Sequence, residues 1–66
     1  MKSFAEIIEV MGGPTAAARK LSTSMQNCQQ MRERNNIPAR YWPALVAQVE
    51  GLTFEKLAKM AAERAA

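Results

Sequence analysis

Four amide side chains stand close together in the middle of the chain: Gln26, Asn27, Gln29 and Gln30. No charged residue occurs between Leu21 and Met31, whereas an ordinary exposed helical face usually carries lysine and glutamate. A glutamine or asparagine amide can donate to N7 of adenine and accept from its N6 amino group together. Gln26 and Gln30 share a helical face at i, i+4 spacing, which makes them the first candidates for base contacts, followed by Gln29.

Basic and hydroxyl side chains surround these amides. Residues 14–40 hold five basic residues against Glu33 alone, and so carry the whole excess of a chain whose formal net charge is +3. Such a segment suits a polyanion, and the positive end of a helix that begins after Ser24 can also face a phosphate. The predicted base contacts are Met25, Gln26, Gln29 and Gln30. The predicted contacts to a phosphate backbone are Thr15, Arg19, Lys20, Thr23, Ser24, Asn27, Arg32, Arg34 and Arg40.

Plainer interpretations of the same residues remain open. The amides could form a simple polar surface, and the arginines a solvated face. Arg40 could pair with an acid such as Glu50, and Met25 could contact a thymine methyl group or be partly buried. Tyr41 and Trp42 suit packing or a dimer contact, with the core favoured for Trp42. A lone cysteine on the inner side of a helix, as expected for Cys28, is usually a small core residue.

Caps and breaks predict the first two helices that position these residues. The segment Ser3-Phe4-Ala5-Glu6 is a capping box, and apolar residues at positions 4, 7, 8 and 11 then line one helical face. Gly12-Gly13 ends this helix, because glycine adopts the left-handed conformation at little cost. Pro14 begins a second helix that ends at Leu21, and its inner side is made small by Ala17-Ala18.

The third helix is predicted over residues 25–34. Three hydroxyl residues, 22–24, favour side-chain bonds to the backbone and so interrupt the helical pattern, and Ser24 is the expected cap. The pair Asn35-Asn36 is the expected stop, since asparagine tolerates the left-handed conformation. The residues expected on its inner side, about one turn apart, are Met25, Cys28 and Met31.

The remaining residues predict a turn and two more helices. We expect a short turn over 38–41 and a helix over 43–50, with inward residues Leu45, Val46 and Val49. Gly51 should close that helix and Thr53 should cap the last one. The last helix is expected to bury Phe54, Leu57 and Ala58, together with Met60 or Ala61. The tail 62–66 is expected to fray, and no strand is predicted because nothing alternates with a period of two.

The segment from Pro14 to Ser24, followed by Cys28, Met31 and the stretch 37–43 (Ile-Pro-Ala-Arg-Tyr-Trp-Pro), resembles the Cro-type transcription regulators of lambdoid phages. It is especially similar to their all-helical branch, which also includes YdaS-like antitoxins encoded in prophages. The resemblance implies a single five-helix, all-α, repressor-like helix-turn-helix domain over residues 1–66. Its motif helices would be about 14–21 and 25–34, the second lying in the major groove.

Residue by residue, the resemblance makes Ala18 the small residue of the first motif helix. Ser22 stands where the family usually has glycine, Cys28 where it usually has valine or isoleucine, and Met31 where it often has a bulky apolar residue. A residue other than glycine at position 22 must accept an unusual backbone angle, which predicts a slightly different turn.

The expected function is therefore a sequence-specific DNA-binding regulator, a Cro-like repressor of phage or prophage origin. The expected partners are double-stranded DNA and a second copy of the chain, which could pair in free solution or only on DNA. The alternative is an antitoxin-like or other protein-interaction module that uses the helix-turn-helix as a scaffold.

Composition argues against other classes. The chain has no histidine or aspartate, its glutamates are scattered, and no metal-ligand cluster is visible, so neither an enzyme nor a cofactor is expected. No apolar run approaches the ~18 residues of a membrane span, and no signal peptide is visible. One cysteine allows no internal disulfide, and we expect a cytoplasmic protein.

Overall fold

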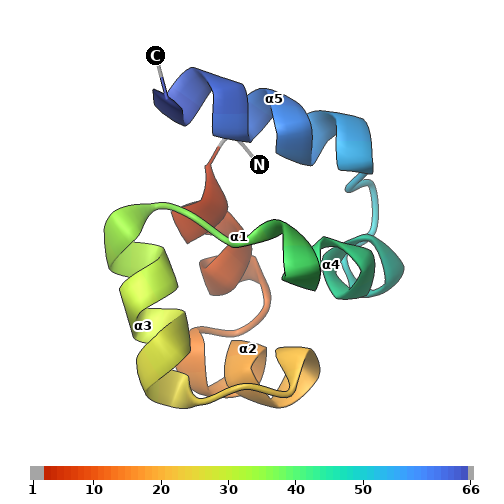
Figure 1. Ribbon diagram of the computed structural model, residues 1–66. Coiled ribbons are helices and arrows are strands. Elements are labelled where there is room, and N and C mark those ends of the chain that lie inside the picture. Colours follow the sequence, from red (N-terminus) through yellow and green to blue (C-terminus); the bar gives the residue numbers. More distant parts are fainter. Residues whose placement is uncertain (1–2, 66) are drawn as a thin grey trace.

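The computed structural model describes residues 3–65, which contain five α-helices, one short 3₁₀ turn and the segments that connect them (Figure 1). The helices are α1 (Phe4–Val10), α2 (Pro14–Leu21), α3 (Met25–Arg34), α4 (Trp42–Gln48) and α5 (Phe54–Ala65), and the 3₁₀ turn η1 is Ala39–Tyr41. Residues 3–65 contain no strand. The predicted all-α, five-helix fold is confirmed.

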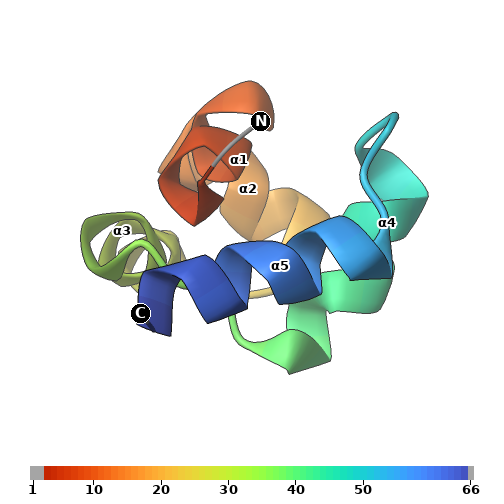
Figure 2. The ribbon, with the colours of Figure 1, turned by 90° about the horizontal axis from the view of Figure 1, so that it is seen from above.

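The helices enclose one apolar core. In two perpendicular views, α3 and α4 lie on opposite sides of the molecule, and α5 passes across one end of it (Figure 1 and Figure 2). Every helix contributes to a single cluster of buried residues, whose largest fully buried members are Phe4, Ile7, Ile8, Ile37, Leu45 and Leu57. No described residue with a polar or charged side chain is buried. The outer side of α3 is left uncovered by the other helices.

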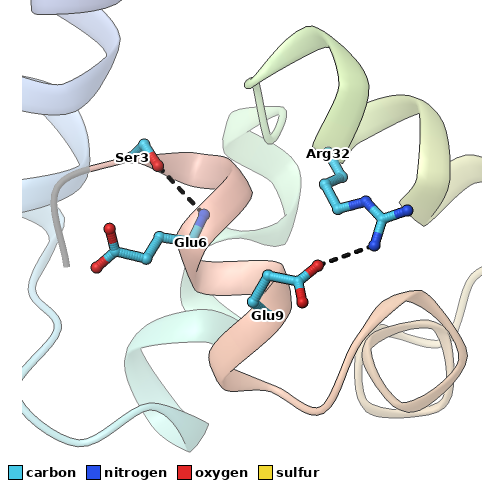
Figure 3. Close-up of polar contacts among 4 residues, drawn as sticks. All are labelled: Ser3, Glu6, Glu9 and Arg32. Carbon is cyan, nitrogen blue, oxygen red and sulfur yellow. Dashed lines mark hydrogen bonds and ion pairs between the residues drawn. The ribbon is translucent and has the colours of Figure 1, made fainter.

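α1 begins at the predicted residue but ends at Val10, short of Met11, whereas α2 begins and ends at the predicted residues. Ser3 Oγ accepts from the backbone N–H of Glu6 at 3.2 Å, which caps α1 (Figure 3). Gly12 has a φ of +106°, and a Cβ there would lie 2.9 Å from the Cβ of Ala16. Only glycine therefore allows α1 and α2 to approach each other so closely through this turn.

The turn between α2 and α3 accepts a backbone angle that usually selects glycine. Ser22 has φ 55° and ψ 48°, in the left-handed region, as its position in the turn predicts. Ser24 then caps α3, since its Oγ accepts from the backbone N–H of Asn27 at 3.0 Å. Asn35, with φ 52°, ends α3. The predicted bounds of α2 and α3 are both confirmed.

Trp42 packs against the core, as predicted. Its ring stacks on Phe4 with centroids 6.4 Å apart, and its Nε1 donates to the carbonyl of Ile37 at 2.9 Å. Its neighbour Pro43 occupies the first turn of α4 rather than its first residue, so the predicted start of α4 is wrong by one residue. Proline is tolerated throughout that turn because the N–H groups there have no helical partner.

The predicted end of α4 is also wrong. The helix stops at Gln48 because Val49 is extended, with φ −105° and ψ 111°. Gly51, with φ +83°, therefore lies in the turn beyond the helix and does not close it directly. Leu45 and Val49 are buried as expected, whereas Val46 is only half-buried.

Part of the predicted inner side of α5 is wrong. Thr53 Oγ1 accepts from the backbone N–H of Lys56 at 3.2 Å and caps the helix as predicted. Leu57 and Met60 are buried and Ala61 is half-buried, but Ala58 falls on the outer side. Phe54 is 53% exposed, whereas Leu52, two residues earlier, is buried.

α5 continues through residues 62–65, most of the tail for which fraying is predicted. Alanine, glutamate and arginine favour a helix there. Residue 66 lies outside the described residues.

Candidate nucleic-acid interface

The outer side of α3 carries a stripe of polar side chains. Gln26, Gln29, Gln30 and Glu33 follow one another at i, i+3, i+4 and i+7, and we call these four residues the α3 stripe. Gln29 is half-buried and the other three are exposed. Within residues 3–65, none of the four side chains has a hydrogen-bond or ion-pair partner. The stripe therefore has unused donors and acceptors that point away from the core.

Glu33 belongs to this surface, although the sequence argument did not select it. In the sequence it stands out only as the single acid of residues 14–40. The signal that could have found it is its spacing, since seven residues bring the helix back to within about 20° of the direction of Gln26. The outer face of α3 therefore ends in a carboxylate as well as carrying amides.

The opposite side of α3 is fixed in the core. Cys28 is fully buried and Met31 is nearly so, as predicted. Burial raises the pKa of the Cys28 thiol, which keeps it protonated and inert. Because the two sides of α3 are so different, the stripe cannot turn inward without exposing this apolar side.

Asn27 positions the helix, which differs from its predicted role as a phosphate contact. Its Nδ2 donates to Thr23 Oγ1 at 2.9 Å and to Tyr41 Oη at 3.1 Å. Tyr41 Oη also donates to Thr23 Oγ1 at 3.3 Å, so the three side chains form a closed triangle. The triangle joins the turn before α3 to η1. Sequence reasoning missed this role of Tyr41, because it depends on two elements that are distant in the chain.

Arg40 rests on Tyr41 and does not pair with Glu50. Its guanidinium carbon lies 4.9 Å from the centre of the tyrosine ring, and its Nη2 lies 3.5 Å from the phenol oxygen. The hydrogen bond with Thr23, and then the Arg40 guanidinium, lower the pKa of Tyr41 from its usual value. The cation is thereby held beside the triangle and close to α3.

A shallow hollow of about 190 Å³ runs beside the α3 stripe. Its lining includes Gln30 and Arg34 of α3, and Arg40 approaches from η1. Arg34 is exposed and pairs with no carboxylate among residues 3–65. Two of the predicted cationic contacts thus share one depression with a predicted base contact, which suits a ligand with a negatively charged edge.

The first turn of α2 meets the first turn of α3. Thr15 Oγ1 donates to Met25 Sδ at 3.1 Å, and Met25 is 48% exposed rather than packed on the inner side. Arg19 follows Thr15 by one helical turn, is exposed, and pairs with no carboxylate in the described residues. Thr15, Arg19 and Met25 therefore flank the N-terminal end of the stripe.

Two predicted phosphate contacts are directed toward α1 instead. The Arg32 guanidinium pairs with Glu9 at 2.8 Å between Nη1 and Oε1 (Figure 3). Lys20 Nζ donates to the carbonyl of Met11, the residue that follows α1, at 3.1 Å. Both cations are at the surface but are bound to groups of α1 or of the residue that follows it. Thr23 and Ser24 are also used internally, in the triangle and in the cap of α3.

Comparisons with protein-family models, with curated proteins and with solved structures found nothing that matches this chain. Separately, none of the helices within residues 3–65 is both long and apolar enough to cross a membrane. The function of this chain is therefore inferred from the chemistry and geometry of the α3 surface.

Proposed function

We propose that this chain is a sequence-specific DNA-binding regulator that inserts α3 into the major groove. In keeping with its resemblance to the Cro-type regulators, it would act as a repressor by occupying an operator and blocking polymerase. The amides of Gln26, Gln29 and Gln30 would read base edges, adenine above all. Arg19, Arg34 and Arg40 would contact the phosphates on either side and set the register.

One observation supports the proposal above the others: the α3 stripe is polar, exposed and without partners among residues 3–65, on a helix that several other elements hold in place. Asn27, Arg32 and Met31 are held by the triangle, by Glu9 and by the core, respectively. A helix held so firmly offers the stripe in one orientation. A helix already held in place loses little rigid-body freedom when its amides meet base edges, which favours binding.

The first experiment measures binding of labelled duplexes to the whole chain. An operator is first enriched from a random pool, and Kd is then measured on this operator and on a scrambled duplex of equal length. Gln30→Ala should weaken operator binding by about 1–3 kcal/mol and leave scrambled-DNA binding nearly unchanged. Arg34→Ala should weaken binding to both, and the affinity of every form should fall steeply with salt.

Two control variants make this result specific. Lys59→Ala removes an exposed cation of α5 and should change neither Kd substantially. Arg32→Ala removes a cation that Glu9 already holds, so it should reduce affinity less than Arg34→Ala does. Equal losses on operator and scrambled DNA for Gln30→Ala would refute the role of that residue. Absence of binding to any duplex at low salt would refute the proposal.

A protein-interaction module is the second candidate, and a different surface favours it. Val10 is 58% exposed and borders a hollow of about 200 Å³ that is also lined by Lys20, Gln48 and Glu50, with no residue of α3 in its lining. Such a surface suits a protein partner or a second copy of the chain. If protein binding were the main function, substitutions at Val10 would abolish the effect of the chain on its protein partner in cells and would leave any DNA affinity intact.

A further inference from the structure

Glu33 is the last residue of the α3 stripe, and its position calls for a specific explanation. It is exposed, and it pairs with no cation within residues 3–65 although Arg32 and Arg34 adjoin it in sequence. Arg32 is held by Glu9, and Arg34 lines the hollow on the other side of the helix. An unpaired carboxylate on the surface that meets a polyanion would weaken binding unless it faced a hydrogen-bond donor.

The helical geometry determines which part of the DNA this carboxylate would face. Glu33 projects within about 20° of the direction of Gln26, because seven residues make nearly two full turns. In a groove bordered by two phosphate backbones, the middle of the inserted face lies over the base edges and its flanks lie nearest the phosphates. Arg34 and Arg40, beside the hollow, occupy a flank, whereas Glu33 occupies the middle.

We propose that Glu33 is a specificity-determining residue that accepts a hydrogen bond from the N4 amino group of a cytosine; this inference rests on the proposed function. A carboxylate can only accept, so it suits the cytosine amino group and disfavours guanine O6 and N7 and thymine O4. Adenine also offers an amino group, but its acceptor N7 lies beside that group and repels a carboxylate. The glutamines can both donate and accept, which suits adenine. The stripe therefore specifies two kinds of base edge.

The spacing along α3 places this cytosine within the operator. Seven residues advance the helix by about 10 Å, and successive base pairs are separated by about 3.4 Å. With α3 lying along the groove, the cytosine read by Glu33 lies about three base pairs from the pair read by Gln26. The pairs between them face Gln29 and Gln30.

The experiment enriches duplexes from a random pool with the wild type, Glu33→Gln and Glu33→Ala. Glu55→Gln is the matched control, since Glu55 is an exposed acid in the first turn of α5. The wild type and the control should enrich the same operator. Glu33→Gln should change the preferred base at one position from cytosine to adenine, and Glu33→Ala should lose preference at that position only.

Direct titration gives the size of the effect. Replacing the cytosine pair should weaken wild-type binding about tenfold and weaken Glu33→Ala less than about threefold. Both substitutions should strengthen binding to scrambled DNA, because a negative charge is removed from the surface that meets the polyanion. Circular dichroism of each variant should show the wild-type helical content, since Glu33 is exposed.

The outcomes separate this inference from the proposed function. If the wild type enriches an operator and both Glu33 variants enrich the same one with unchanged preferences, Glu33 reads no base and the inference is wrong while the proposed function stands. If the wild type enriches no sequence, both are wrong. A change of preference confined to one base pair in Glu33→Gln supports both.

Discussion

The two longest helices, α3 and α5, are built alike but present different outer faces. Each is capped by a hydroxyl side chain, Ser24 or Thr53, and each buries apolar residues on one side. The outer side of α5 alternates in charge at i, i+4 spacing, through Glu55, Lys59 and Glu63. The outer side of α3 carries uncharged amides until Glu33. Burial therefore explains why each helix docks, and only the chemistry of the exposed face separates a solvated helix from a candidate reading helix.

The two helices also differ in how many elements hold them. Beyond the core, α3 is joined by side chains to α1 through Arg32 and Glu9, to η1 through Asn27 and Tyr41, and to α2 through Met25 and Thr15. The polar contacts of α5 are local, such as Lys56 Nζ to the carbonyl of Gly51 at 2.7 Å. This difference suggests that the orientation of α3 matters more than that of α5. The predictions below test that contrast.

The largest effect is expected in the core, where the two helices should behave alike. Met31→Ala in α3 and Leu57→Ala in α5 should each lower the free energy of unfolding by about 2–5 kcal/mol, because each leaves a cavity. A domain of this size has a total of about 3–10 kcal/mol, so either variant should be largely unfolded well before the wild type in urea. Gln30→Ala should change stability by less than about 0.5 kcal/mol.

The variants Gln30→Ala and Met31→Ala test directly whether the outer side of α3 is separate from the structural core. If Gln30→Ala destabilised the chain as much as Met31→Ala, the α3 stripe would be part of the structural scaffold. It could not then serve as a free reading surface.

The next effect concerns the C-terminal end of α3. Asn35 adopts the left-handed conformation. Its Oδ1 accepts from the backbone N–H of Ala5 at 2.9 Å, a group in the first turn of α1 that has no partner within the helix. Asn35→Gly should lose the acceptor and cost about 1 kcal/mol. Asn35→Ala should lose the acceptor and the tolerated backbone conformation, and so cost about 2–3 kcal/mol in chemical denaturation.

Thr53→Ala provides the matched variant in α5, because it removes a local cap without touching another helix. It should cost about 1 kcal/mol. An Asn35→Ala variant as stable as Thr53→Ala would mean that the link between α3 and α1 adds nothing, and the contrast between the two helices would weaken.

The helix bounds of the N-terminal half could be predicted from sequence because their signals are local. The capping box at Ser3, the turn glycines and the cap at Ser24 each act within a few residues. The bounds of α4 and the burial of Phe54 could not be predicted in the same way. They depend on how the chain between α4 and α5 returns to the core, where Leu52 takes the buried place.

The candidate site was predictable only in part, for a related reason. The amides of α3 could be identified because they lie within two turns of one helix. Arg32 and Arg34 look equivalent in the sequence, but they project in directions about 160° apart. Only the packing of α1 against α3 brings Glu9 to Arg32, across 23 residues, and leaves Arg34 without an acid.

The smallest predicted effect concerns this ion pair. A double-mutant cycle with Glu9→Gln and Arg32→Gln should give a coupling energy of about 0.2–1 kcal/mol, because both side chains are substantially exposed. The coupling should decrease as salt is raised from low to physiological concentration. A cycle of Glu55→Gln with Lys59→Gln on α5 provides a comparison, because those residues share one helix face and join no second element.

The size of the coupling energy between Glu9 and Arg32, compared with that between Glu55 and Lys59, decides the role of Arg32. A measurable coupling at Glu9 that exceeds the α5 value would support Arg32 as a link that orients α3, and Arg32→Gln would then reduce DNA affinity mainly by loosening the helix. A coupling of zero, together with a loss of DNA affinity as large as that of Arg34→Gln, would return Arg32 to the phosphate contacts expected from the sequence. In that case Arg32 would belong to the DNA-binding surface of α3, and its contact with Glu9 would not contribute to holding the helix.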